Sequence, residues 1–432
     1  MKKMTKYASV LLSFMLVGVS ALADDGSDNA YSNYSKFGIG TLNPAGTAYS
    51  RSMGGVGVAT RNNKFINTIN PAAVTARDTL AFMADFGLRQ NNVYFDQGNI
   101  STVDNTCNIY NFTMSFPIWR SSAFMIGVNP YSSVGYEFAD SVTDPNIIGN
   151  TGNLTDMYYG FGSLYDAYIG AGVTFWKRLS IGAQFIYMFG DLEKQHNLVF
   201  SSDSYKSVYS GSSMYMRGIT GKFGLQYEQP LGKRKSLIVG ATYRIGNKMS
   251  GQAENYVQTI QSSVADTLKN TSVELGSIRL ASEFAVGVSY RNKDKFSAEI
   301  NYSRSDWTKS NLDKTEGFST GAFTTSVSQS VNAGVEWIPN YNDIRYYMRR
   351  CSYRMGAYYN QEYYKFAGNT VSSYGITFGA TFPVFSGYNG ISVGVDLGQR
   401  GSLQNSLIRE RYVNFSVAFN IFDIWFVKSR YE

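Results

Sequence analysis

The chain has 432 residues and a formal net charge of +7, and its 33 tyrosines and 28 phenylalanines make it rich in aromatic side chains. Charged residues account for only 16%, against about 25% in a typical soluble domain, and no basic run suggests binding to nucleic acid. Two cysteines exclude a disulfide framework. A single histidine, His196, leaves no cluster for histidine-based catalysis or metal binding. We therefore predict a protein that is not an enzyme and that has no cofactor or metal site.

Residues 1–23 have the features of a secretory signal peptide. Lys2, Lys3 and Lys6 precede an apolar stretch from residue 8 to 19, and Ala21-Leu22-Ala23 fits the small-residue cleavage pattern. An uncleaved membrane helix is the alternative, which the short apolar stretch disfavours. After Ala23 no run of about 18 apolar residues follows, so the rest of the chain contains no candidate transmembrane helix.

Residues 24–78 do not alternate between apolar and polar positions. They contain the glycine pair Gly54-Gly55 and the turn sequence Asn70-Pro71-Ala72, and their apolar content argues against disorder. We expect this segment to fold as a plug, or hatch, inside the domain that follows, with Asn70, Pro71 and Ala72 fitting closely against its wall. A periplasmic extension is the alternative.

Residues 79–432 contain fourteen segments in which apolar and polar residues alternate. Each is long enough for the roughly 9–11 residues that a tilted strand needs to cross a bilayer. The pattern predicts an all-β fold, a closed antiparallel transmembrane barrel of fourteen strands. The approximate limits are 79–90, 107–117, 121–138, 165–176, 179–190, 213–228, 236–249, 280–291, 294–305, 325–337, 345–360, 373–383, 390–399 and 409–421.

The links between these segments alternate in length. Short links follow the even-numbered segments, and longer links such as 91–106, 139–164, 191–212 and 306–324 follow the odd-numbered ones. Outer-membrane barrels combine short periplasmic turns with long extracellular loops. Both termini are therefore expected in the periplasm, and His196 is expected in a solvated outer loop.

Opposite faces of each strand can be assigned from the alternation. Phe284, Val286 and Val288 share one face, and Ala285 and Gly287 share the other. The apolar sets should face lipid, because a closed barrel pairs all of its backbone polar groups within the wall. Inward glycines leave room in the lumen for water, a ligand or a plug.

Several motifs, taken in order, resemble those of the FadL/TodX outer-membrane transport family and its Bacteroidetes branch. The similarity covers essentially the whole mature chain. The motifs are Tyr34-Ser35-Lys36-Phe37-Gly38-Ile39-Gly40, Arg51-Ser52-Met53-Gly54-Gly55-Val56-Gly57-Val58-Ala59, Asn70-Pro71-Ala72-Ala73, Gly127-Val128-Asn129-Pro130-Tyr131-Ser132-Ser133-Val134-Gly135-Tyr136, Gly398-Gln399-Arg400-Gly401, Arg409-Glu410-Arg411-Tyr412 and Trp425-Phe426-Val427-Lys428-Ser429-Arg430-Tyr431.

The resemblance implies a hatch-plugged barrel for passive uptake of hydrophobic compounds such as long-chain fatty acids, which bind in the barrel and leave sideways at a kink in the third strand. Pro130 is the candidate for that kink, with Tyr131 and Gly135, because proline has no N–H to give to a strand ladder. A simple bulge at the barrel rim is the alternative. Expected partners are outer-membrane lipid, lipopolysaccharide and a hydrophobic small molecule, and the protein is expected to be a monomer.

Two arginines are candidate anchors for a ligand carboxylate. Arg354 and Arg244 fall on the inward phase of their strands, where pairing with lumen acids such as Glu299 or Asp396 is the alternative role. Two other functions also remain open, a general diffusion porin and an accessory barrel of a secretion or assembly machinery. The chemistry of the lumen should discriminate between uptake and the accessory role. An apolar pocket supports transport, whereas an occluded lumen with large structured outer loops supports the accessory role.

Overall fold

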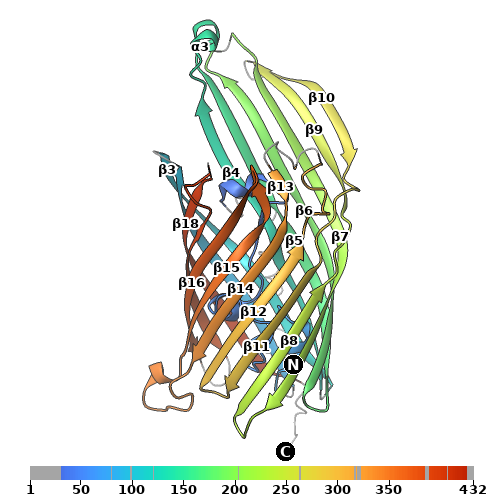
Figure 1. The fold of residues 1–432 in the computed structure, drawn as a ribbon, viewed down its shortest axis with the longest axis vertical. Coiled ribbons are helices and arrows are strands. Elements are labelled where there is room, and N and C mark those ends of the chain that lie inside the picture. The colour runs from blue at the N-terminus through green and yellow to red at the C-terminus, as the bar shows by residue number, and fades with distance from the viewer. Residues whose placement is uncertain are drawn as a thin grey trace, which may run out of the picture.

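The computed structural model describes residues 31–425 apart from 79, 98–99, 120, 203, 262–263, 316–317, 319–322, 385–388 and 406. The predicted signal peptide lies outside the described residues, and so does the chain after Trp425. Within the described part, fourteen antiparallel strands form a closed wall, because the last strand pairs with the first. The predicted fold class is thus confirmed (Figure 1).

The wall strands follow one another around the barrel in sequence order, each paired with the next. They are β2 (Ala81–Gln97), β3 (Ile100–Trp119), β4 (Ser122–Ser141), β5 (Leu154–Phe175), β6 (Leu179–Phe200), β7 (Ser207–Pro230), β8 (Lys235–Arg244), β11 (Glu283–Asn292), β12 (Phe296–Asp306), β14 (Val327–Trp337), β15 (Ser352–Phe366), β16 (Asn369–Pro383), β17 (Gly390–Arg400) and β18 (Arg409–Ile424).

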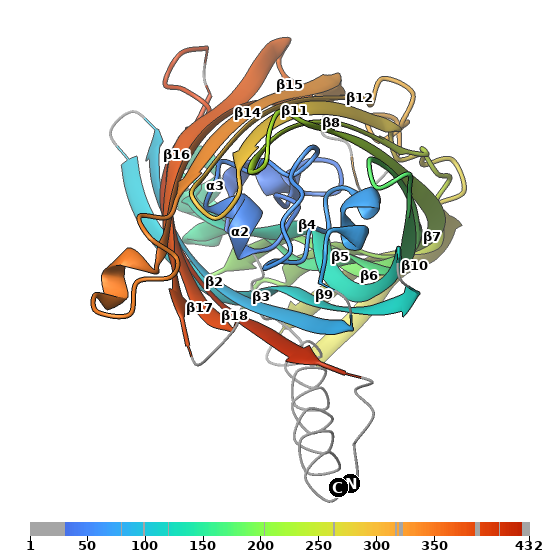
Figure 2. The ribbon, with the colours of Figure 1, turned by 90° about the horizontal axis from the view of Figure 1, so that it is seen from below.

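The described part of the N-terminal segment lies inside this ring of strands, where Figure 2 shows it in blue. It contains η1 (Asn33–Lys36), β1 (Thr41–Leu42), α2 (Ala48–Arg51) and η2 (Pro71–Thr75). The remaining elements belong to connections between wall strands. They are α3 (Pro145–Thr151), β9 (Ser250–Gln261), β10 (Val264–Glu274), β13 (Phe323–Thr325) and η3 (Tyr347–Arg349).

The two faces of the wall have the predicted chemistry. On β11, Phe284, Val286 and Val288 are exposed, whereas Ala285 and Ser289 are buried toward the lumen. The same alternation is clear on β6, β8, β16 and β17, so the barrel presents an apolar girdle on its outside. Trp119, Trp176 and Trp337 lie at the end with the short turns, as the aromatic belts of membrane proteins do.

Several predicted loops are wrong, because the strands continue through them. Residues 91–106 are mostly the ends of β2 and β3, and much of 139–164 and 191–212 belongs to β4, β5, β6 and β7. His196 is therefore a residue of β6, where its Nε2 lies 2.6 Å from Asp156 and its ring stacks on Tyr158. Beyond the membrane both faces of a strand meet water, so the alternation that identifies a strand is lost.

The extended strands give the barrel one tall side. β4, β5, β6 and β7, together with the β9–β10 hairpin, rise past the outer ends of β14 to β18 (Figure 1). Within the described residues, no helix has the length and apolar character needed to cross a membrane. Cys107 and Cys351 are both free thiols.

Candidate functional site: the lumen and the gap between β3 and β4

The Asn70-Pro71-Ala72 turn is fully buried against β5, β6 and β7. The Asn70 side chain accepts a hydrogen bond from the Ala72 N–H at 3.0 Å, and its Nδ2 donates to the carbonyl oxygens of Val58 at 2.7 Å and of Leu225 at 3.3 Å. This amide therefore caps η2, joins two parts of the N-terminal segment and binds the wall of the barrel.

Glycines on the wall make the room that this turn occupies. A Cβ atom on Gly182 would lie 2.4 Å from the Pro71 carbonyl carbon, and one on Gly224 would lie 2.0 Å from the Asn70 side chain. These distances are far below van der Waals contact, so these inward glycines are sites where the turn closely approaches the wall, through its backbone at Gly182 and through side chains at Gly224.

Gly54 and Gly55 form a second close contact with the wall. Both have positive φ, +73° and +85°, which other residues rarely adopt. The Gly54 N–H donates to the Thr377 hydroxyl at 2.8 Å, and a Cβ atom at Gly54 would lie 2.7 Å from the Ala357 carbonyl oxygen. The structure thus brings all five predicted hatch residues against the barrel wall.

Charged groups hold the segment near the end with the short turns. Arg61 pairs with Glu228 at 3.4 Å, and Lys64 pairs with Asp294 at 3.1 Å while its ammonium lies 3.4 Å from the centre of the Tyr341 ring. Burial lowers the pKa of the Lys64 ammonium, and the nearby Asp294 carboxylate opposes that shift. These pairs join the N-terminal segment to β7 and to the turns that follow β11 and β14.

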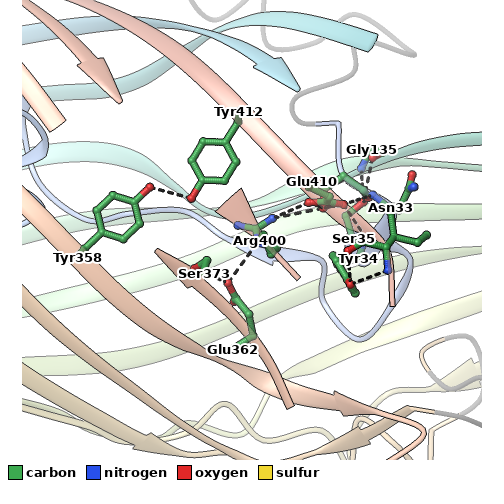
Figure 3. Close-up of polar contacts among 12 residues, drawn as sticks. Asn33, Tyr34, Ser35, Gly135, Tyr358, Glu362, Ser373, Arg400, Glu410 and Tyr412 are labelled. Atoms are coloured by element: carbon green, nitrogen blue, oxygen red, sulfur yellow. Dashed lines mark hydrogen bonds and ion pairs between the residues drawn. The ribbon is translucent and has the colours of Figure 1, made fainter. Parts of the chain in front are cut away.

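A second polar cluster holds the segment near the outer end of the wall (Figure 3). The Ser32 hydroxyl and the Asn33 N–H donate to the carboxylate of Glu410, at 2.9 Å and 2.8 Å. Arg400 lies 3.5 Å from Glu410 and 3.2 Å from Glu362, so one guanidinium links two buried carboxylates. Sequence reasoning missed this cluster, because its members come from distant parts of the chain.

The wall has a gap between β3 and β4. Their pairing runs from Trp119 and Ser122 to Phe112 and Val128 and then stops, although both strands continue outward. Pro130 lies two residues beyond the last pair, and a bulge follows it, since the β4–β5 register shifts between Pro130 and Ser132. The predicted kink residue therefore lies where the wall loses its pairing.

The N-terminal segment takes the place of β3 along this edge. The Asn43 N–H donates to the Tyr131 carbonyl, and the Ser32 N–H donates to the Gly135 carbonyl, each at 2.9 Å. Between these bonds β1 pairs antiparallel with β4, with Thr41 opposite Ser133. The edge of β4 is thus satisfied by the protein's own leading residues rather than by its neighbour in the wall.

A cavity of about 400 Å³ lies in the lumen and reaches the gap at Pro130 and Tyr131. Its lining is mixed, because charged and hydroxyl side chains contribute to it together with apolar ones such as Val58, Ile69 and Ile186. Arg244 pairs with Asp166 at 3.0 Å, and Arg89 pairs with Asp396 at 3.1 Å. The ion pairs hold these charges inside the barrel, so each buried charge has a partner.

The two predicted anchors have different surroundings. Arg244 lines the cavity and lies 4.5 Å from the Tyr131 ring. Arg354 is buried beneath the N-terminal segment, donates to the Ser52 hydroxyl at 3.1 Å and lies 3.9 Å from Glu336. Each pairs with a lumen acid, though not with the Glu299 or Asp396 suggested by the sequence.

Glu299 and Asp396 have partners of their own. The Glu299 carboxylate accepts from the Ala59 N–H at 2.9 Å and from the Thr60 hydroxyl, so it holds the N-terminal segment. Asp396 accepts from the Tyr358 hydroxyl at 2.8 Å, in addition to its pair with Arg89.

The outer mouth of the barrel is filled by an apolar cluster. Trp307, Phe318, Tyr363 and Tyr364 are at most 1% exposed and pack with Ile39 of the N-terminal segment. Trp307 and Phe318 come from the connection between β12 and β14, which the sequence presented only as a long loop. This packing joins the N-terminal segment to β15 and to the connection between β12 and β14.

Comparison with known proteins places the chain in a family. The sequence model of the BamG family matches residues 4–432. The chain belongs to the BamG family. A search of curated proteins finds no match for this BamG-family chain.

Several solved structures share the fold. The CymD monoaromatic hydrocarbon channel has a TM-score of 0.60 at 14% identity, over 88% of this chain and 98% of that one. The toluene transporter TbuX of Ralstonia pickettii has a TM-score of 0.56 at 15% identity, over 87% of this chain and 98% of that one. A FadL homologue from Pseudomonas aeruginosa has a TM-score of 0.57 at 11% identity, over 89% of this chain and 99% of that one. At these identities the likeness supports the FadL/TodX fold predicted from the motifs.

Proposed function

We propose that this BamG-family chain is an outer-membrane barrel that acts as a protein-binding accessory of a secretion or assembly machinery rather than as a conduit for solutes. The observation that carries the proposal is the apolar filling of the outer mouth, where Trp307, Phe318, Tyr363 and Tyr364 are at most 1% exposed. A conduit needs a route between solvent and its binding site, and among the described residues side chains packed like a domain core obstruct that route from the outside.

The N-terminal segment supports the same proposal. We take residues 24–78 as the hatch and 79–432 as the barrel, after a signal peptide at 1–23. Glu410, Glu299 and Glu228 bind the segment at three places along its length, and β1 adds to the edge of β4. Moving so many buried polar contacts together would cost far more than thermal motion supplies.

The surface offers a place for a protein partner. The tall side formed by β4 to β7 and the β9–β10 hairpin stands clear of the rest of the rim (Figure 1). Every residue of β10 is exposed, including Val264 and Leu268. An exposed, structured extension of this kind offers a surface on which another protein could dock.

Two measurements test the proposal. Proteoliposomes that contain the purified protein should take up toluene or a fatty acid no faster than protein-free liposomes. Cells depleted of the protein should lose surface-exposed or outer-membrane proteins before they lose uptake of apolar compounds. Accelerated uptake in the proteoliposomes, abolished by blocking the gap, would refute the accessory function.

Passive uptake of a hydrophobic compound is the second candidate, and the gap between β3 and β4 favours it. The cavity reaches that gap at Pro130, so a molecule inside would have a lateral way out once β1 left the edge of β4. In this reading Arg244 would anchor the polar end of an amphiphile such as a fatty acid, with Arg354 as the other predicted anchor. Pro130→Val, which restores an N–H to the strand, should then slow uptake, whereas the accessory function predicts no effect.

A further inference from the structure

The turn that joins β14 to β15 lies outside the barrel. In Figure 2 it is the orange projection that extends away from the ring of strands. Two hydrogen bonds place it against the outer face of the wall. The hydroxyl of Tyr353 donates to the Met348 carbonyl at 3.0 Å, and the hydroxyl of Tyr347 donates to the Pro383 carbonyl at 2.9 Å.

Tyr353 belongs to the lipid-facing side of β15. It pairs with Trp337, which is 54% exposed, and shares the phase of the exposed Met355. The turn, residues 340–350, therefore extends from its base at Tyr341 to lie beside the membrane at the end with the short turns. That end faces the periplasm in barrels of this kind.

The exposed side chains of the 340–350 turn have the composition of a membrane interface. Ile344 is fully exposed, and Tyr346, Tyr347 and Met348 are 43–55% exposed. Aromatic residues of this kind concentrate where the bilayer meets water, since one end of the ring is apolar and the other is polar.

Three arginines add a positive charge to this surface. The turn contains three basic residues, Arg345, Arg349 and Arg350, and one acidic residue, Asp343. Asp343 accepts from two backbone N–H groups of its own turn and from Arg349 at 3.4 Å, so it is already occupied. The guanidinium carbons of Arg349 and Arg345 lie 4.6 Å and 5.3 Å from the centre of the Tyr346 ring. Planar guanidinium groups held in this way are suited to phosphate.

We propose that the 340–350 turn binds anionic phospholipid headgroups in the periplasmic leaflet of the outer membrane. Ile344 and Met348 enter the headgroup region, and the arginines bind phosphate. The inference does not depend on the proposed function, since it needs only the barrel's orientation in the bilayer. The base of the turn also contacts the N-terminal segment, because the Tyr341 ring covers Lys64.

Native mass spectrometry of the purified full-length barrel with phosphatidylglycerol or phosphatidylcholine tests the proposal. Arg345→Gln with Arg349→Gln removes two exposed charges and should weaken phosphatidylglycerol binding roughly 30-fold, taking about 1 kcal/mol for each basic residue. Phosphatidylcholine binding should change little. The control variant is Lys233→Gln with Arg234→Gln, in the exposed turn between β7 and β8. It removes the same charge from a turn whose residues 231–234 include no aromatic side chain, and it should leave phosphatidylglycerol binding unchanged.

Equal phosphatidylglycerol binding by the wild type and the Arg345/Arg349 variant would overturn the proposal, and so would an equal loss in the Lys233/Arg234 control. Heat-modifiable gel mobility verifies that each variant is a folded barrel. A photo-crosslinking residue, Ile344→p-benzoylphenylalanine, gives a second measurement in cells. A lipid adduct is expected, and a protein adduct in its place would show that the turn docks a protein instead.

Discussion

Adding one methyl group to the wall should loosen the N-terminal segment. In Gly182→Ala the new Cβ would lie 2.4 Å from the Pro71 carbonyl carbon, whereas ordinary contacts begin at 3.4 Å. The turn must therefore move by about 1 Å, which is 3.4 minus 2.4. The neighbouring atoms are backbone, so no side-chain rotation can absorb the overlap.

This displacement should break two hydrogen bonds between the turn and the wall. They are Asn70 Nδ2 to the Leu225 carbonyl at 3.3 Å, and the Thr174 hydroxyl to the Thr75 hydroxyl at 2.7 Å. A further 1 Å lengthens both donor–acceptor distances beyond the usual limit for a hydrogen bond. At about 1 kcal/mol each, the docking free energy of the segment falls by about 2 kcal/mol, and the undocked population rises roughly 30-fold.

Hydrogen–deuterium exchange measures this population directly, since backbone amides exchange when the segment opens. We expect the protection of amides 72–76 to fall by up to that factor in Gly182→Ala, while the wall strands keep theirs. Gly221→Ala is the matched control, because its new Cβ would meet no atom closer than 3.6 Å. Unchanged protection in Gly182→Ala, or the same loss in Gly221→Ala, would refute the close-packing argument.

Three further changes test other contacts of the segment. Glu410→Ala removes the acceptor of Ser32 and one partner of Arg400 and should destabilise the outer contact by roughly 3 kcal/mol; faster exchange confined to residues 31–36 would verify this, and faster exchange throughout the segment would contradict it. Trp307→Ala should lower the unfolding free energy by about 3–5 kcal/mol, which thermal denaturation in detergent measures; a change below 1 kcal/mol would show that the mouth is not packed as a core. Deletion of residues 24–70 should raise ion conductance in planar bilayers, and a truncated barrel as tight as the wild type would count against a plug.

Local patterns in the sequence predicted the wall well. The alternation of Phe284, Val286 and Val288 with small inward residues follows from the two-residue period of a strand next to lipid, and the structure confirms it. Pro130 could be singled out for the same kind of reason, since a missing N–H is a property of one residue. The strand ends beyond the membrane could not be located, because water on both faces removes the contrast between apolar and polar positions.

The sequence alone therefore determined the number of wall strands, their faces and the existence of a leading segment of different character. Only the tertiary structure decided what fills the barrel. Glu410 binds Ser32 across 378 positions of sequence, Trp307 packs into the mouth, and ion pairs such as Arg244 with Asp166 place charged groups in the cavity. Strand periodicity is a local property set by backbone geometry, whereas lumen chemistry depends on which distant side chains closure of the wall brings together.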